Sequence, residues 1–174
     1  MGYLEYKSVY LAGPMHSCND DGIGWRNWIT PRLKKSFNLH VEDPSKKSVN
    51  GVCEVADDKK RFRQLAFEEN WKELKEQFYP IVRKDLRCVD KADFLIAVYD
   101  PSLHMFGTIN EIIVASQQKK PVLVKYDRSH LKEFNPWITC LVKANWLFAE
   151  WDDMFKYMEK IDSGDIETSH WGLD

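Results

Sequence analysis

The apolar run Phe94–Tyr99 (FLIAVY) is the feature that most constrains the fold of this chain. Runs of this length without polar alternation are typical of strands buried on both faces, as in parallel sheets. Four other short segments have the composition of strands: Ser8–Ala12, Leu39–Glu42, Pro121–Tyr126 and Trp146–Ala149. The sequence therefore predicts a mostly parallel, five-stranded sheet.

Segments with helical periodicity separate these runs. They cover Gly24–Lys35, Phe62–Tyr79, Ile81–Lys91, Ile109–Gln118, Leu131–Lys143 and Asp152–Ile161, with Pro80 expected to break or offset the helical pattern between the second and the third. Alternating strands and helices predict an α/β chain, a single-domain Rossmann-like or flavodoxin-like sandwich. We expect this domain to cover residues 1–162. Residues 163–174 are expected to form a C-terminal tail, as an arm or a contact for a partner.

Composition excludes several classes of protein. A chain of 174 residues suits one domain, and its 13% aromatic content excludes a disordered protein. The formal net charge of −2 excludes a general nucleic-acid footprint. No apolar run reaches the roughly 18 residues of a membrane span, and residues 1–13 lack the apolar stretch of a signal peptide. We therefore expect a cytoplasmic protein without nucleic-acid or membrane partners. The basic run from Lys59 to Arg63 is interpreted as a solvated helix start in preference to a phosphate site.

Cysteine and histidine spacing predicts no metal site. The cysteines are widely separated, without a CxxC pair, and the five histidines are equally dispersed. In a cytosolic protein such cysteines are expected to be reduced thiols. We therefore expect no zinc and no other metal cofactor.

Unusual residues follow the expected strands, at the sheet edge where parallel α/β proteins bind ligands. The first strand is followed by Gly13, Pro14, Met15, His16 and Ser17, the second by Asp43, and the third by Asp100, Ser102, Gly107, Thr108 and Asn110. The glycine-rich dinucleotide fingerprint and the phosphate-binding loop are both missing from the sequence. Redox and kinase functions therefore lose their main support.

Three carboxylates each allow a structural and a catalytic interpretation. Glu111 is either a helix-start residue that forms a capping box with Thr108 or a reactive carboxylate. Asp85 is either a surface residue beside Arg83 and Lys84 or part of a site. Asp93, directly before the central strand, is favoured as a turn or cap residue. Tyr10 suits the core and a pocket equally well.

Taken in order, several short motifs resemble the nucleoside 2-deoxyribosyltransferase superfamily, which includes nucleotide N-glycosidases. The motifs are Val9-Tyr10-Leu11-Ala12-Gly13-Pro14-Met15, Asp85-Leu86 with Val89-Asp90-Lys91-Ala92-Asp93, and Gly107-Thr108 with Asn110-Glu111, followed by Ala115 and Lys120-Pro121-Val122. Each motif is weak alone, but the ordered set is specific. It covers about residues 8 to 126.

The resemblance implies roles for individual residues. Glu111 would be the nucleophile that attacks the anomeric carbon of the sugar, and Asp85 would orient it and handle a proton near the base. Tyr10 and the loop from Gly13 to Ser17 would line the sugar and base site. Asp100 and Ser102 would contact sugar hydroxyls or a phosphate, and Trp137 would lie in a loop over the base or at a neighbouring subunit.

The chain also departs from the family pattern. The transferases carry an Asp six residues before the nucleophile, where Met105 stands here, and His104 or Asp100 is a candidate substitute. Trp25 and Trp28 suit either base stacking or core packing. Arg26 is a candidate phosphate or sugar contact.

The expected activity is therefore cleavage or transfer at the N-glycosidic bond of a (deoxy)nucleoside through a covalent glycosyl-Glu intermediate. The alternatives are a (deoxy)nucleoside 5′-monophosphate N-glycosidase, which is a hydrolase, and a non-catalytic nucleotide-binding or sensing module. The small-molecule substrate needs no cofactor in this chemistry. By the same resemblance we expect a homodimer or higher homo-oligomer.

Overall fold

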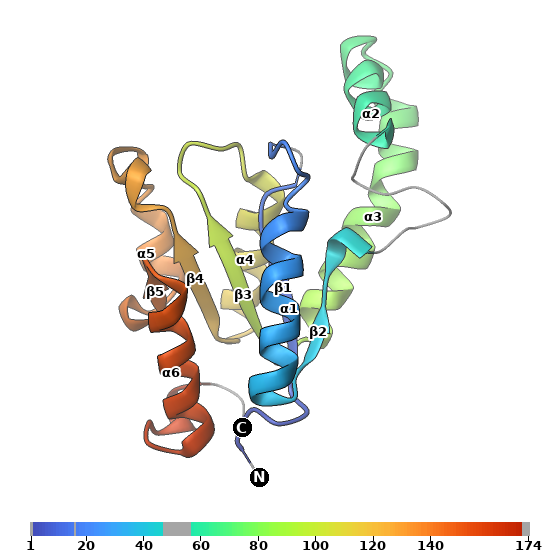
Figure 1. Ribbon diagram of the computed structural model, residues 1–174. Helices are drawn as coiled ribbons and strands as arrows, with labels where there is room; N and C mark the ends of the chain where they lie inside the picture. Colours follow the sequence, from blue (N-terminus) through green and yellow to red (C-terminus); the bar gives the residue numbers. More distant parts are fainter. Residues whose placement is uncertain (1, 16, 47–56, 172–174) are drawn as a thin grey trace.

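A parallel sheet forms the centre of the computed structural model, which describes residues 2–15, 17–46 and 57–171 (Figure 1). Within these residues, five strands are hydrogen-bonded in the order β2-β1-β3-β4-β5, and every pairing is parallel. The strands are β1 (Ser8–Ala12), β2 (His40–Glu42), β3 (Phe94–Tyr99), β4 (Val122–Tyr126) and β5 (Leu147–Phe148). The predicted fold class is confirmed.

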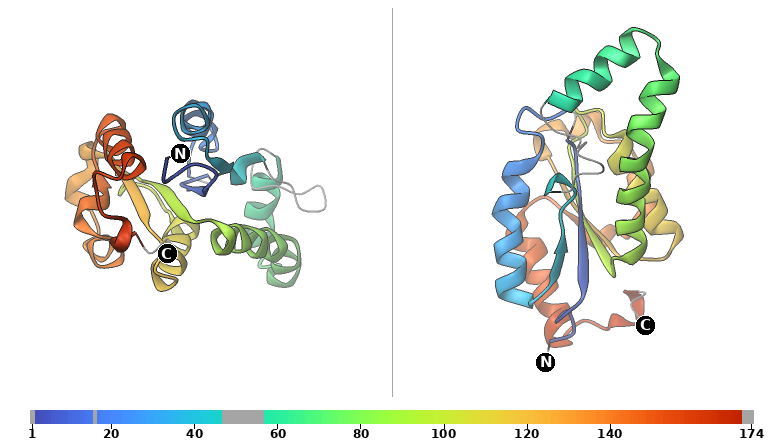
Figure 2. Two further views of the ribbon diagram at one scale, coloured as in Figure 1. Left: turned by 90° about the horizontal axis from the view of Figure 1, so that it is seen from below. Right: turned by 90° about the vertical axis from the view of Figure 1, so that its right-hand side faces the viewer.

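Helices cover both faces of the sheet (Figure 2). One face carries α1 (Ile23–Phe37) and α6 (Trp151–Ser163), and the other carries α3 (Trp71–Lys91) and α4 (Phe106–Gln117). None of the helices that the structure describes combines the length and apolar character of a membrane span. The remaining helical elements are α2 (Asp57–Phe67), α5 (Trp137–Leu141), η1 (Pro44–Lys46), η2 (Arg128–Glu133), η3 (Ala144–Trp146) and η4 (Thr168–His170).

The strand order reverses between β1 and β3. The chain runs from β1 to the neighbouring edge strand β2, and then crosses to β3 on the other side of β1. Successive connections therefore diverge at the carboxyl ends of β1 and β3, which leaves a crevice there. This crevice is where a ligand site is expected in a sheet of this order.

The helical hairpin formed by α2 and the first half of α3 extends past the carboxyl edge of the sheet (Figures 1 and 2). We call α2 together with residues 71–82 of α3 the arm. At its turn, Glu69 has a positive φ of 54°, and the Asn70 side chain accepts a hydrogen bond from the Glu73 amide at the start of α3. Phe67 and Trp71 are exposed at this turn.

Two predicted helix boundaries are wrong. The helix break expected at Pro80 lies instead between Phe67 and Trp71, and α3 continues through Pro80. The single helix expected over Leu131–Lys143 is replaced by η2 and the short α5. Asn135-Pro136 separates these two elements, because the residue before a proline is disfavoured in the helical conformation.

The described residues after α6 lead back to the core. The sequence predicts a C-terminal tail after residue 162 that projects from the domain or contacts a partner. In the structure, however, Trp171 is 1% exposed and packs against Phe94, with a ring-centroid distance of 5.3 Å. Its indole nitrogen donates to the Tyr157 hydroxyl at 3.0 Å. Trp171 thus anchors the described part of the tail to the same core as the sheet.

Candidate active site

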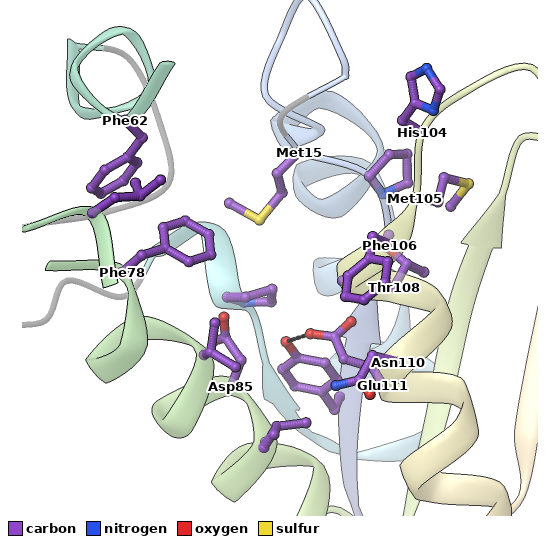
Figure 3. Close-up of a pocket in the computed structure, with 18 of the residues that line it drawn as sticks. Met15, Phe62, Phe78, Asp85, His104, Met105, Phe106, Thr108, Asn110 and Glu111 are labelled. Carbon is purple, nitrogen blue, oxygen red and sulfur yellow. Dashed lines mark hydrogen bonds between the residues drawn. The ribbon is translucent and has the colours of Figure 1, made fainter. Parts of the chain in front are cut away.

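A cavity of about 630 Å³ opens at the carboxyl ends of β1 and β3 (Figure 3). Residues from β1 and the loop after it, from α4 and from the arm line it. It therefore occupies the crevice at the reversal of strand order. Nine of the predicted site residues lie in its wall: Tyr10, Gly13, Pro14, Met15, Asp85, Gly107, Thr108, Asn110 and Glu111.

A short hydrogen bond joins β1 to α4 in this cavity. The Tyr10 hydroxyl donates to Glu111 Oε1 at 2.6 Å (Figure 3). Tyr10 has no exposed surface, because it lies on a central strand whose backbone pairs with β2 and β3. The bond therefore holds the carboxylate of a helix residue against a fixed point of the sheet.

The environment of Tyr10 keeps its hydroxyl protonated. Burial raises the pKa of the Tyr10 phenol well above its ordinary value, and the nearby carboxylates of Glu111 and Asp85 raise it further. A phenol that retains its proton remains a hydrogen-bond donor to Glu111 over the whole physiological pH range.

The capping-box interpretation of Glu111 is wrong. Helix α4 begins at Phe106 with Met105 at the N-cap, so Thr108 lies inside the first turn and Glu111 in the second. A capping glutamate stands three residues after the cap, and Glu111 stands six residues after it. Its side chain is bound to Tyr10 in the cavity instead.

Asp85 projects into the same cavity from α3, opposite α4 (Figure 3). The side chain is half-buried. Asn110, next to Glu111 on α4, also lines the wall. We call Tyr10, Asp85, Asn110 and Glu111 the polar end of the cavity.

Close packing shapes the loop that follows β1. A Cβ atom at Gly13 would lie 2.7 Å from the Trp25 ring, so this position requires glycine. Arg26 lies beneath the loop with no exposed surface. Its guanidinium donates to the carbonyls of Gly13 and Gly22, each at 2.9 Å, and of Leu11 at 3.3 Å.

Arg26 and Asp43 therefore lie behind the cavity and do not line it. Arg26 Nε lies 3.7 Å from Asp43 Oδ1, and both side chains are buried. Burial lowers the pKa of Arg26, while Asp43 opposes this effect. The predicted contact of Arg26 with a phosphate or sugar is replaced by support of the Gly13 loop, because its donors are directed to backbone carbonyls.

The other predicted residues do not line this cavity. The Ser17 hydroxyl donates to the His104 carbonyl at 2.8 Å, and the Ser102 hydroxyl donates to Asp100 Oδ1 at 2.7 Å. Trp137 is exposed on α5, beside a second hollow. His16 lies outside the described residues.

Between the two proposed substitutes for the family's acidic residue, His104 lines the cavity and Asp100 does not. Met105 itself is buried in the wall. Asp100 instead lies near the surface, where its Oδ1 is 3.2 Å from His130 Nδ1. With Asp127, these residues form a group whose potential metal-ligand atoms lie within 4.8 Å of one another among the described residues.

The sequence did not predict the apolar part of the wall. Five arm residues and Met15 share apolar side chains and line the cavity; we call them the apolar compartment. They are Met15, Phe62, Ala66, Leu74, Phe78 and Val82. Helical periodicity indicated that most of these residues face inward, but it gave no sign that they face a cavity.

Lys59 connects the arm to the loop after β1. Its ammonium lies 2.8 Å from Asp21 Oδ1 and donates to the carbonyls of Met15 and Cys18 at 3.4 and 3.2 Å. The interpretation of this residue as part of a solvated helix face is wrong, because its head group is largely enclosed by the loop. Arg63, one turn further along α2, lines the cavity.

No protein-family model and no curated protein matches the sequence. Among solved structures, the chain is similar to a 2-deoxyribosyltransferase from Bacillus psychrosaccharolyticus, with 17% identity and a TM-score of 0.58 over 87% of this chain and 95% of that chain. The chain has a nucleoside 2-deoxyribosyltransferase-like fold.

Two further structures are similar to the chain. A 2-deoxyribosyltransferase from Leishmania mexicana has 18% identity and a TM-score of 0.57 over 88% of this chain and 97% of that chain. A conserved protein from Enterococcus faecalis V583 has 17% identity and a TM-score of 0.56, covering 89% of this chain and 98% of that chain. At these identities the similarity establishes the fold.

Proposed function

We propose that this protein transfers a sugar between bases by cleaving the N-glycosidic bond of a deoxynucleoside. The observation that carries the proposal is the pairing of Tyr10 with Glu111 at 2.6 Å, beside Asp85, in a cavity at the reversal of strand order. The two 2-deoxyribosyltransferases of the same fold support the same class of reaction.

In the first half-reaction, Glu111 acts as the nucleophile. A carboxylate oxygen of Glu111 forms a bond to C1′ of the sugar while the bond from C1′ to the base nitrogen breaks. The electron pair of the broken bond goes to the base, and Asp85 supplies the proton that neutralises it. Tyr10 fixes the attacking carboxylate through its hydroxyl, which the raised pKa keeps protonated.

In the second half-reaction, an acceptor base attacks C1′ and releases the Glu111 carboxylate. The proton that the acceptor loses returns to Asp85. Water in the place of the acceptor would give hydrolysis by the same residues. Transfer and hydrolysis therefore differ only in which acceptor the cavity admits.

The described residues that the sequence predicted as phosphate contacts are hydrogen-bonded within the protein, which favours an unphosphorylated substrate over a 5′-monophosphate. Arg26, the strongest candidate for a phosphate contact, donates to three backbone carbonyls and pairs with Asp43. The Ser17 hydroxyl is bound to the His104 carbonyl in the loop after β3, and the Ser102 hydroxyl is bound to Asp100 in its own loop. We therefore place nucleosides before nucleotides as substrates.

The test is to incubate the purified protein with deoxynucleosides and with their 5′-monophosphates, with and without a free acceptor base, and to follow base release by chromatography. We expect exchange of the base on nucleosides, dependent on the acceptor. Release from monophosphates alone would assign the nucleotide hydrolase instead. Ligand binding without turnover in any of these incubations would contradict the proposal and favour a sensing module.

A further inference from the structure

The polar and apolar groups of the cavity are separated in space. The polar end lies between the facing sides of α3 and α4, whereas Phe62 and Phe78 gather on the arm side, with Met15 directed toward them (Figure 3). The rings of Phe62 and Phe78 pack edge to face at a centroid distance of 5.1 Å. The cavity thus has a reacting end and a separate apolar end.

Helix geometry gives the direction in which the apolar end extends. Leu74, Phe78 and Val82 recur every four residues and so lie along one side of α3, with Asp85 on the next turn. The rise per residue places Leu74 roughly 16 Å from Asp85 along the helix axis. A base that receives its proton from Asp85 would therefore lie at the start of this row of side chains, and the row continues beyond it.

The chemistry of the compartment does not suit a bare base edge. Its six side chains are all apolar, and among the described residues of the arm that line the cavity, Arg63 is the one with a charge. Amino and carbonyl groups placed against this wall would lose their hydrogen bonds to water without replacement. A hydrocarbon group placed there gains the free energy of burial instead.

We propose that the apolar compartment binds a bulky apolar substituent on the outer edge of the base, so that the preferred substrates are deoxynucleosides with such a group. This inference rests on the proposed function, because cleavage at Glu111 sets the orientation of the base. The cavity of about 630 Å³ lies well within the range for ligands larger than a simple nucleoside.

The first test compares matched substrate pairs at the level of kcat/KM. The pairs are N6-benzyl-2′-deoxyadenosine with 2′-deoxyadenosine, and N4-benzyl-2′-deoxycytidine with 2′-deoxycytidine. Burial of a phenyl-sized group predicts a preference of about tenfold to a hundredfold for the benzyl member of at least one pair. Equal or lower values for both benzyl substrates would overturn the proposal.

Variants that fill the compartment should remove the preference. Ala66→Trp fills it from α2 and Leu74→Trp fills it from α3, and with either variant the benzyl-to-parent ratio should fall to about one. The matched control is Phe67→Trp, because Phe67 is adjacent to Ala66 but is 85% exposed and lies outside the cavity wall. If both filled variants fold and keep the full preference, the substituent binds elsewhere and the proposal is wrong.

Binding of free bases separates this proposal from the proposed function. Calorimetry would compare 6-benzylaminopurine with adenine on the wild-type protein and on Ala66→Trp. Tighter binding of the benzyl base, lost in Ala66→Trp, supports the compartment even if no nucleoside is cleaved, in which case the proposed function alone fails. Turnover of nucleosides with no benzyl preference in either assay would overturn the compartment alone.

Discussion

The polar end and the apolar compartment belong to one cavity but are supported by different parts of the molecule. Tyr10 lies on a central strand, and Glu111 is held against it by a hydrogen bond of 2.6 Å. Most of the compartment lies on the arm, which extends past the sheet and is joined to the loop after β1 by Lys59 (Figure 1). The proposed reacting groups Tyr10 and Glu111 are thus held by the core, whereas the proposed substituent site lies mostly on a helical hairpin outside the sheet.

The largest effect on stability should come from beneath the polar end. Arg26→Leu removes the buried cationic partner of Asp43 and the donor to the carbonyls of Leu11, Gly13 and Gly22. We expect a loss of about 3–5 kcal/mol in the free energy of unfolding, measured by urea denaturation. Arg32→Leu is the matched control, because Arg32 is exposed on the same helix. Equal losses of unfolding free energy in both variants would show that the buried contacts of Arg26 stabilise the protein no more than those of an exposed arginine.

Asp85→Asn should slow the reaction without changing which base is preferred. Loss of a general acid costs about a hundredfold in kcat, and the loss should be greatest for bases that leave poorly without a proton. Asp90→Asn on the exposed side of α3 serves as the control. A variant with normal kcat and altered benzyl preference would show that Asp85 belongs to recognition and not to the chemistry.

Lys59→Met should loosen the junction between the arm and the rest of the protein. The variant removes one ion pair and two hydrogen bonds to carbonyls, for an expected loss of about 1–3 kcal/mol in stability. We expect KM for benzyl substrates to rise while kcat changes little. Lys72→Met, at an exposed position of α3, should change neither quantity. A large fall in kcat would contradict the separation of the two ends.

The smallest effect concerns the Tyr10 hydroxyl and pH. An unfolded tyrosine ionises near pH 10, whereas the raised pKa keeps folded Tyr10 protonated there, so the unfolded state loses its proton first. Stability should therefore fall as pH rises above about 10, more steeply in the wild type than in Tyr10→Phe. Urea denaturation at several pH values measures this, and identical slopes would contradict the pKa argument. The same variant should lower kcat about tenfold.

The central strands β1, β3 and β4 could be predicted because each is an apolar run with the length and composition of a buried strand. Phe94–Tyr99 was predicted with the bounds that β3 has in the structure. The boundary between α2 and α3 could not be predicted in the same way. The apolar faces of both helices line one cavity, so the periodicity continues across the turn at Glu69 and Asn70.

The site was predictable only in part. The short motifs of the resemblance identified Tyr10, Asp85 and Glu111, which the fold brings to one cavity. The role of Arg26 left no sequence pattern, because its partners are mostly backbone carbonyls. That the arm lines the cavity could be found only from the three-dimensional arrangement. An oligomer stays a prediction.

The most direct test of the central claim is to trap the sugar on the nucleophile. A 2′-fluoro-substituted arabinonucleoside should form the glycosyl ester and release it slowly, because the fluorine destabilises the oxocarbenium-like transition state. Mass spectrometry of the digested protein should then find the sugar on Glu111, with no adduct in Glu111→Gln and a normal adduct in the surface control Glu159→Gln. Base release from deoxynucleosides that persists in Glu111→Gln, or an adduct on another residue, would contradict the account.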